Sequence, residues 1–339
     1  MARHRHNRGV DQDAVAAVVE RWGRFARDEA PGRSALYTAW AQRVVDDPIV
    51  AEAVARVPAN RRQPPLVFAV QRLLGAPEHD VEAWARWAVA HAVAVAAECS
   101  RRSVQTNEPL RCAALLPALS LIDGPIALIE VGVSAGLCLY PDRYSYRYHG
   151  RDGEVRALDP ATGVSAVVLD SDLDGEPPLR LPEIVWRAGI DLAPLDARQQ
   201  LDRAWLTGLV WPGEDGRRER VEAALDIVAA DPPRLVAADG ADALPALAAA
   251  APADATLVVT TPGVLAHVPG PRRSAIVAAA RAAGRWITLD APSLHDAWTR
   301  LPEPWPGGFA LALDGDVIAA VDPLGASVAW HPGSWSSAQ

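Results

Sequence analysis

Acidic residues follow several short apolar runs in the C-terminal two thirds of the sequence. Glu130 lies in "IALIEV", Asp172 in "VVLDSDLDG", and Asp239 closes "RLVAAD". In a parallel sheet, ligands bind beyond the carboxyl ends of the strands, where an acid can accept hydrogen bonds from ribose hydroxyls or from an amine. A carboxylate there can also take a proton from an amine nucleophile. We therefore predict Glu130, Asp172 and Asp239 as catalytic residues, with a solvated acidic loop as the alternative for residues 170–174.

A glycine-rich turn follows the first of these acids. The sequence "EVGVSAG" places two glycines and a serine at alternate positions, directly after a predicted strand. Glycine lets the backbone approach a ligand closely, as in the turns of nucleotide-binding folds, although glycine at such a turn is often structural. We predict that the turn and two of the acids bind a cofactor. The predicted cofactor-binding residues are Gly132, Ser134, Gly136, Asp172 and Asp239.

A further set of polar and aromatic residues is predicted to contact the substrate. These residues are Asn107, Glu108, Arg111, Trp211, Thr260, Thr261 and His267. Arginine can hold an oxyanion such as sulfate through two parallel hydrogen bonds, and threonine hydroxyls can also donate to it. Structural alternatives exist: Asn107 can cap a helix, Trp211 can pack in the core, and His267 can be a satisfied structural histidine.

The pattern of apolar residues predicts the elements that position these side chains. Over residues 1–123, apolar residues recur every three or four positions, which predicts an all-helical N-terminal region. Over residues 124–339, continuous apolar runs alternate with Ala-rich helical stretches, which is typical of a parallel sheet covered on both faces. The expected parallel strands cover residues 126–131, 165–170, 233–239, 255–261 and 285–290.

The C-terminal stretches "GFALALDGDVIAAVD" and "ASVAWH" predict antiparallel strands instead. The first contains a hairpin that turns at Asp314-Gly315. Five parallel strands followed by such a hairpin is the layout of a methyltransferase-type sheet. The predicted fold class is therefore α/β, with a Rossmann-like sheet of the S-adenosylmethionine methyltransferase type and an all-helical N-terminal region.

Composition excludes several classes of function. The sequence contains no lysine, so all 33 basic residues are arginine, which excludes a Schiff-base lysine, a pyridoxal phosphate enzyme and a P-loop. A net charge of −9 argues against a nucleic-acid partner and favours an amine-bearing small molecule. The three cysteines lack a paired spacing and no histidine pair in the folded region has ligand spacing, so we predict no metal site.

The sequence has no pattern of a membrane span or a signal peptide. Its longest apolar window, residues 83–98, contains Arg86 and His91 and is too short to cross a bilayer. The basic N-terminus has no apolar run behind it. We therefore expect no membrane partner and a cytoplasmic location.

Five segments in a fixed order carry a resemblance to a known family. They are "RQPPLVFAVQRLL", "TNEPLRCAALLPAL", "IEVGVSAGLCLYPDRYSY", "WRAGIDLAPLD" and "VWPGEDGRRERVEAAL". From about Pro64 to its C-terminus, the chain resembles a large actinobacterial family of unknown function with a methyltransferase-like fold. It departs from the expected patterns at three positions: Ser134 replaces a third glycine of the turn, and Cys138 and Thr261 replace a common asparagine and a common histidine.

The resemblance implies a function in specialised metabolism. Some proteins similar to this family belong to antibiotic pathways that make azabicyclic aziridines of the azinomycin type. This implies an enzyme for nucleophilic substitution at carbon, most concretely an intramolecular C–N ring closure with loss of sulfate and no required cofactor. One alternative is a small-molecule methyltransferase with S-adenosylmethionine as cofactor. A further alternative is a non-catalytic scaffold that binds a partner protein, because the aziridine-forming relatives are implied to act with a small companion subunit.

Overall fold

The computed structural model describes residues 11–105, 107–296, 298, 301 and 305–331. The chain forms two compact units, Met1–Thr106 with Gln200–Arg218, and Asn107–Gln199 with Glu219–Gln339. This differs from a single division between residues 123 and 124. The reason is that the helix over residues 111–119 packs on strands of the second unit, while the helix over residues 200–208 packs with the first.

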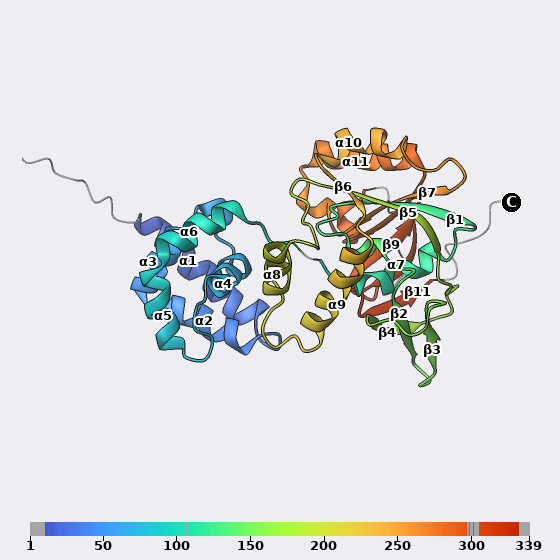
Figure 1. Cartoon of the computed structure of the whole chain (residues 1–339). Coiled ribbons are helices and arrows are strands. Elements are labelled where there is room, and N and C mark those ends of the chain that lie inside the picture. The colour runs from blue at the N-terminus through green and yellow to red at the C-terminus, as the bar shows by residue number, and fades with distance from the viewer. Residues whose placement is uncertain (1–10, 106, 297, 299–300, 302–304, 332–339) are drawn as a thin grey trace, which may run out of the picture. The chain divides into compact units, whose positions relative to one another are not determined.

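The first unit is built from helices (Figure 1). They are α1 (Gln12–Arg24), a π-helix (Phe25–Glu29), α2 (Ala35–Asp46), α3 (Pro48–Ala55), a 3-10 turn (Ala59–Arg61), α4 (Pro64–Leu73), α5 (Val81–Ala90), α6 (Ala92–Arg101) and α8 (Gln200–Gly208). Carboxylates that accept backbone N–H groups fix several helix starts: Asp11 caps α1, Asp47 caps α3 and Asp80 caps α5. The helical N-terminal region is confirmed.

The second unit is built around one mixed sheet, which has eleven strands in the described part of the chain (Figure 1). The strand order is β3-β2-β4-β11-β10-β9-β8-β7-β1-β5-β6. The strands are β1 (Pro125–Val131), β2 (Ser145–Gly150), β3 (Val155–Leu158), β4 (Val168–Asp174), β5 (Glu183–Asp191), β6 (Arg234–Ala237), β7 (Thr256–Pro262), β8 (Arg285–Asp290), β9 (Phe309–Leu313), β10 (Asp316–Val321) and β11 (Ser327–Trp330). The chain is thus a mixed α/β protein.

One half of this sheet is parallel. Strands β6, β5, β1, β7 and β8 lie side by side, and each pair of neighbours runs parallel. After β1 the chain forms β2, β3 and β4 in the other half of the sheet. It then adds β5 and β6 on one side of β1, and finally crosses to add β7 and β8 on the other side of β1. The order therefore reverses at the boundary between β1 and β7, which is where doubly wound sheets bind their ligands.

The strand expected at residues 165–170 does not belong to this parallel half, which corrects the predicted strand order. Residues of β4 pair with β2 and β11 in the other half of the sheet. Along β4, Leu169 and Leu173 are buried while Asp170 and Asp172 are exposed. This alternation is typical of a strand with one solvated face, whereas strands covered on both faces are more continuously apolar. The neighbour of β1 is instead β5.

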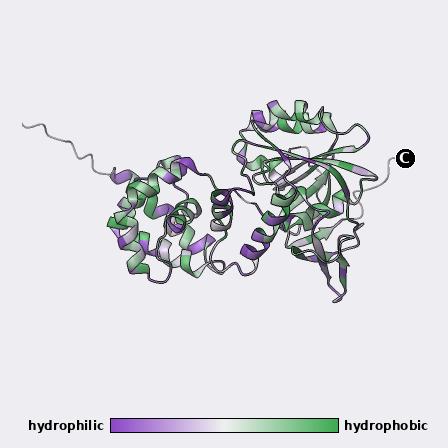
Figure 2. Ribbon diagram, in the orientation of Figure 1, coloured by the Kyte–Doolittle hydropathy of each residue, from purple (hydrophilic) through white to green (hydrophobic). Residues whose placement is uncertain are grey.

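Helices pack on both faces of the sheet. Helices α10 (Gly240–Ala248) and α11 (Gly270–Ala283) pack on one face of the parallel half over a core of buried apolar residues. Helix α7 (Arg111–Leu119) lies on the other side of the sheet from α10 and α11 (Figure 1), where it contacts β4, β8, β9 and β11. Helix α9 spans Arg217–Ala230. Figure 2 shows hydrophobic residues along much of the sheet, with hydrophilic ones on the outer sides of the helices.

The C-terminal strands confirm the predicted antiparallel hairpin. Strands β9 and β10 pair antiparallel and turn at Asp314 (φ 54°) and Gly315 (φ 97°). Positive φ at both central residues is what a two-residue hairpin requires. Strand β11 then pairs antiparallel with β10. None of the described helices is both long and apolar enough to cross a membrane.

Candidate functional site

The turn after β1 has an unusual backbone. Gly132, Ser134 and Gly136 all adopt positive φ, with values of 79°, 51° and 84°. At Gly132 a Cβ atom would lie 2.4 Å from Cγ2 of Val264, so only glycine fits there. Ser134 is not a glycine, and the left-handed region costs such a residue roughly 1–2 kcal/mol. The surrounding structure must therefore hold this turn in place.

Asp191, at the C-terminal end of β5, holds the turn. Its Oδ2 accepts the backbone N–H of Ser134 at 2.9 Å, and its Oδ1 accepts the N–H of Ala193 at 2.9 Å. Asp191 thus occupies the place that Asp172 was expected to fill, an acid at the end of the strand next to β1. It joins the glycine-rich turn to the loop that follows β5.

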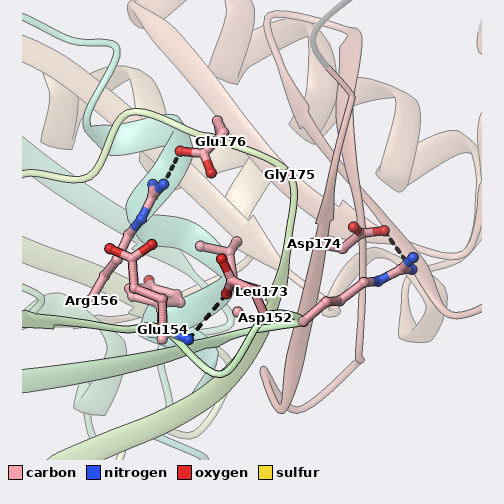
Figure 3. A pocket seen from close by; sticks show the side chains of 10 residues that line it. Asp152, Glu154, Arg156, Leu173, Asp174, Gly175 and Glu176 are labelled. Carbon is pink, nitrogen blue, oxygen red and sulfur yellow. Dashed lines mark hydrogen bonds and ion pairs between the residues drawn. The ribbon is translucent and has the colours of Figure 1, made fainter.

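Asp172 lies elsewhere in the second unit. It is exposed on β4, and strands β11, β10, β9, β8 and β7 lie between β4 and β1. Figure 3 shows the neighbouring residues around a cavity of about 220 Å³, where Asp174 pairs with Arg151 at 2.7 Å and Glu176 pairs with Arg156. The expectation that Asp172 lies beside the glycine-rich turn is therefore wrong, because it rested on the wrong strand order. A catalytic or cofactor-binding role for Asp172 stays a prediction.

Asp239 lies near the expected place but is committed to structural contacts. It caps α10 by accepting the N–H of Ala241 at 2.9 Å, and it pairs with Arg272 at 2.7 Å. The hydrogen bond from Arg272 lowers the pKa of Asp239. A low pKa makes a carboxylate a weak proton acceptor. These contacts argue against Asp239 as the base, and they leave its role in cofactor binding a prediction.

Glu130 is the predicted acid whose environment suits proton transfer. It lies in β1 between Ile129 and Val131, which belong to the core under α10 and α11, so its side chain is directed to the α7 face. It is 4% exposed, and among the described residues its Oε2 has no hydrogen-bond partner. Such an orphaned buried oxygen is uncommon and calls for a donor.

The surroundings of Glu130 raise the pKa of its carboxyl. Burial raises the pKa of the Glu130 carboxyl well above its usual value, and the charges of Cys138 and Asp191 raise it further, while the Arg111 guanidinium lowers it. A carboxyl with a raised pKa binds a proton more tightly than an ordinary one, so its ionised form is a stronger proton acceptor. The cluster of buried Glu130 and Cys138 with half-buried Arg111 and Asp191 is therefore the candidate site.

Arg111, in the first turn of α7, supplies the positive charge of this cluster. Its Nε donates to the carbonyl of Pro323 at 3.0 Å, and its Nη1 donates to the carbonyl of Pro262 at 3.1 Å. Its guanidinium also lies against Gly263, where a Cβ atom would be 3.3 Å from Nη2. These contacts place a fixed positive charge at the C-terminal end of β7.

Glu108 and Asn107 precede α7. Glu108 is 1% exposed, and its Oε1 accepts from Arg220 Nε at 2.9 Å and from the N–H of Leu110 at 3.0 Å. The capping interpretation of Asn107 is wrong, since α7 begins at Arg111 and its N-cap position is Leu110, with no side-chain cap. The Nδ2 of Asn107 is buried and lacks a partner among the described residues. Both residues therefore remain candidates for ligand contact beside Arg111.

The two cysteines near Glu130 are buried thiols. Cys112 Sγ lies 3.7 Å from the carbonyl of Cys138, and Cys138 Sγ lies 3.5 Å from the carbonyl of Glu108. Burial raises the pKa of the Cys112 thiol well above its usual value. A thiol in this state is not a thiolate nucleophile. Within the described part of the chain, no group of three or more His, Cys, Asp or Glu residues is arranged to hold a metal ion.

Three of the remaining predicted substrate contacts, Thr260, Thr261 and His267, lie in different environments. Thr260 is buried, and its hydroxyl donates to the carbonyl of Ile129 at 3.3 Å. Thr261 is buried on the other face, where its hydroxyl donates to that of Thr288 at 2.7 Å. His267 is exposed in a short 3-10 turn after β7. The three residues do not form one cluster.

Trp211 belongs to the first unit. Its ring lies 5.3 Å from that of Phe25, and the Arg33 guanidinium carbon lies 3.9 Å from its centroid. These contacts favour the packing alternative for Trp211. It is therefore set aside as a substrate contact.

A cavity lies beside the glycine-rich turn. It has a volume of about 280 Å³ and is lined by Ala135 of the turn, the loop over residues 194–198, and Val228, Pro233 and Leu235. Its walls are largely apolar, and the Asp196–Arg198 pair stands at its rim. A cavity of this kind suits the apolar part of a small ligand.

The family of the chain follows from a comparison of its sequence. Residues 19–330 match the family DUF2332, described as an uncharacterized protein conserved in bacteria. The chain belongs to this family. No curated protein and no solved structure matches the chain.

Two acids of the strand ends were missed in the sequence. Asp191 ends β5, whose sequence contains Arg187 and Gly189 and so lacks a continuous apolar run. Asp290 closes "RWITLD", and the rule that selected Asp239 selects Asp290 equally well. Only Asp191 lacked a signal in the sequence, because the composition of β5 does not show that this strand pairs with β1.

Proposed function

We propose that the chain is an enzyme that carries out nucleophilic substitution at saturated carbon on an amine-bearing small molecule. Its most concrete form is intramolecular C–N ring closure with loss of sulfate. The observation that carries this proposal is the buried Glu130 carboxyl, with its raised pKa and its unpartnered oxygen, at the end of β1. A protonated amine that enters the site can donate to that oxygen and lose its proton to it.

The reaction has a simple balance of atoms and charges. The ammonium group first gives a proton to the ionised carboxylate of Glu130, which leaves a neutral amine with a free lone pair and a neutral carboxyl. The nitrogen then forms a bond to the neighbouring carbon, the C–O bond breaks, and sulfate departs with the electron pair. The protein contributes by positioning the reacting atoms and by stabilising the charge that develops in the transition state. These are its main contributions in a displacement without covalent catalysis.

Arg111 supports the departure of an anion. Its guanidinium is fixed by the carbonyls of Pro262 and Pro323, so its charge needs no rearrangement as the negative charge develops. The buried Asn107 amide, whose Nδ2 lacks a partner among the described residues, is a second donor of suitable chemistry near the start of α7. Both groups were predicted as substrate contacts, and the proposal keeps them in that role.

Release of sulfate from vicinal amino sulfate esters tests this function. The simplest probe is 2-aminoethyl hydrogen sulfate, and a panel of substituted analogues extends it. Glu130→Gln keeps the size of the side chain and removes the base, so sulfate release is expected to fall by roughly 100-fold or more. Asp172→Asn is the matched control and should behave like the wild type. Equal rates for Glu130→Gln and the wild type would refute the assignment.

A second candidate, an S-adenosylmethionine-dependent methyltransferase, is favoured by Asp191. The strand order around β1, the positive-φ turn and the acid at the end of β5 are arranged as in sheets that bind a ribose at this edge. Each carboxylate oxygen retains a lone pair beyond its backbone contact and can accept a ribose hydroxyl. Asp191 and the turn would hold the cofactor, which would supply a methyl group to the amine.

Calorimetry separates the two candidates. S-adenosylmethionine and S-adenosylhomocysteine are titrated into the wild type, into Asp191→Asn and into Asp172→Asn. Micromolar binding that is lost only in Asp191→Asn would favour methyl transfer. Absence of heat at millimolar ligand, together with sulfate release from the ester probes, would favour ring closure.

A further inference from the structure

Glu130 belongs to a row of residues that crosses four parallel strands. Its register partners are Thr260 on β7 and Gly189 on β5, and Gly189 pairs in turn with Leu235 on β6. The two neighbours of Gly189 along β5 belong to the core under α10 and α11. Because successive residues of a strand face opposite sides of the sheet, position 189 is directed to the α7 face, as Glu130 is.

Val133 covers the glycine in this row. A Cβ atom at Gly189 would lie 2.3 Å from Cγ2 and 2.5 Å from Cβ of Val133, so the valine side chain rests directly on the glycine. Val133 is 1% exposed. Neighbouring strands are about 4.8 Å apart, so this side chain stands next to Glu130 on the β5 side.

The cavity beside the glycine-rich turn lies beyond Val133. Leu235 lines this cavity, and it is two strands away from Glu130 in the row, which is roughly 10 Å. Contacts at Gly136 connect the valine with the cavity wall. A Cβ atom there would lie 3.7 Å from Val133 Cγ2 and 3.2 Å from Cγ of Pro233, which also lines the cavity. Val133 therefore stands between the Glu130 carboxyl and a cavity of about 280 Å³.

The turn holds Val133 in one position. Both of its neighbours, Gly132 and Ser134, have positive φ, and Asp191 accepts the N–H of Ser134. A valine side chain is also restricted at χ1, because it is branched at Cβ. Val133 is therefore a rigid partition between Glu130 and the cavity.

We propose that Val133 is a specificity-determining residue, which limits the size of the substituent that the substrate carries beside its amine. The inference rests on the proposed function and narrows its substrate class. When the amine donates to Glu130, a substituent directed towards β5 meets the valine. The accepted esters are therefore unsubstituted or carry only a small group on that side. In the wild type, the cavity beyond Val133 stays closed to the substrate.

A comparison of two esters tests this role. Sulfate release is measured for 2-aminoethyl hydrogen sulfate and for both enantiomers of 2-amino-4-methylpentyl hydrogen sulfate, whose branched chain is attached beside the amine. The wild type is expected to prefer the small ester by about tenfold or more in kcat/KM. In Val133→Ala this preference should fall by about tenfold, because the loss of two methyl groups connects the space beside Glu130 with the cavity.

The double variant Val133→Ala with Gly189→Ala is the matched control. The new methyl group at position 189 takes nearly the place of the removed valine carbon, since the two positions lie 2.3 Å apart. The partition is then rebuilt from the strand instead of the turn, and the wild-type preference for the small ester should return. A valine with a purely structural role would lower kcat/KM for both esters by the same factor and leave their ratio unchanged.

The outcomes separate the role of Val133 from the proposed function. If the wild type releases no sulfate from any ester, the proposed function fails and the role of Val133 in it fails as well. If the wild type is active but accepts the bulky ester as readily as the small one, only the role of Val133 is overturned. This comparison needs no variant, so it decides the question even where a variant fails to fold.

The variants give a further decision when the wild type prefers the small ester. A folded Val133→Ala with an unchanged preference would overturn the role of Val133, and so would a double variant that keeps the broadened preference. A preference that is lost in Val133→Ala and restored in the double variant supports it.

Discussion

Asp191 Oδ2 accepts the backbone N–H of Ser134 at 2.9 Å, and this contact holds a serine at φ 51° in the turn after β1. The relationship joins two strand ends, since Ser134 follows β1 and Asp191 ends β5. A carboxylate is suited to the task because a charge-assisted hydrogen bond is stronger than a neutral one. The strained turn is thus stabilised by the acid of the neighbouring strand.

Asp191→Asn is expected to destabilise the protein by about 1–3 kcal/mol, since the amide replaces one accepting oxygen by a donor that faces a backbone N–H. Asp172→Asn is the matched control, because Asp172 is exposed on β4, and its change should stay within about 0.5 kcal/mol. Urea denaturation of both variants measures the difference. Equal stabilities would mean that the turn does not depend on Asp191.

Gly132→Ala tests the close approach of the turn to the loop after β7. The new Cβ would lie 2.4 Å from Val264 Cγ2, and the residue keeps a φ of 79°, so both a clash and backbone strain are expected. The cost should exceed that of Gly153→Ala, where φ is 85° but no atom lies within 4 Å. The control measures strain alone, at roughly 1–2 kcal/mol. Thermal unfolding that ranks the two variants equally would argue against the clash.

The sequence predicted much of this fold, and the exceptions have physical reasons. β1, β7 and β8 are buried on both faces, so their continuous apolar runs are visible in the sequence. β5 is not visible, because Arg187 lies within it. That arginine is tolerated because it pairs with Asp142 at 2.5 Å and lies 4.8 Å from the centroid of Tyr140. Both partners are distant in sequence, so no local pattern indicates the strand.

The sequence also predicted only part of the candidate site, because it does not show which distant residues pair with each other. Glu130 and Arg111 were selected from their types and positions, and the structure brings them close enough for their charges to interact. Asp239 was selected by the same rule, yet its partner Arg272 lies 33 residues further along the chain. A rule based on strand ends therefore finds acids at the right edge, but it cannot tell which of them are already paired.

Glu130→Gln should change how stability depends on pH. The folded protein raises the pKa of Glu130, so it binds this proton more tightly than the unfolded chain does. Stability from this group is fully present below the unfolded pKa of about 4.5 and is lost as pH rises towards the folded pKa. Each pH unit in that window costs the wild type about 1.4 kcal/mol.

The glutamine variant has no proton to lose, so it should gain stability relative to the wild type as pH rises above 4.5. Urea denaturation of both proteins at a series of pH values measures this gap. Parallel stability profiles would show that Glu130 is not perturbed in the folded state. The test is independent of any substrate, and it therefore examines the environment of Glu130 without assuming its function.

Thr261→Val tests a buried chain of hydrogen bonds. Trp286 Nε1 donates to Thr261, Thr261 donates to Thr288, and Thr288 donates to Asp290. Valine has nearly the same shape as threonine, but it leaves Trp286 Nε1 without an acceptor in a position that is fully buried. An orphaned buried donor costs about 1–3 kcal/mol. Thr260→Val is the matched control on the adjacent position, because its hydroxyl makes only a 3.3 Å contact with the carbonyl of Ile129. If the two variants lose equal stability, the hydrogen bond that Trp286 Nε1 donates to Thr261 is not what stabilises this side of the sheet.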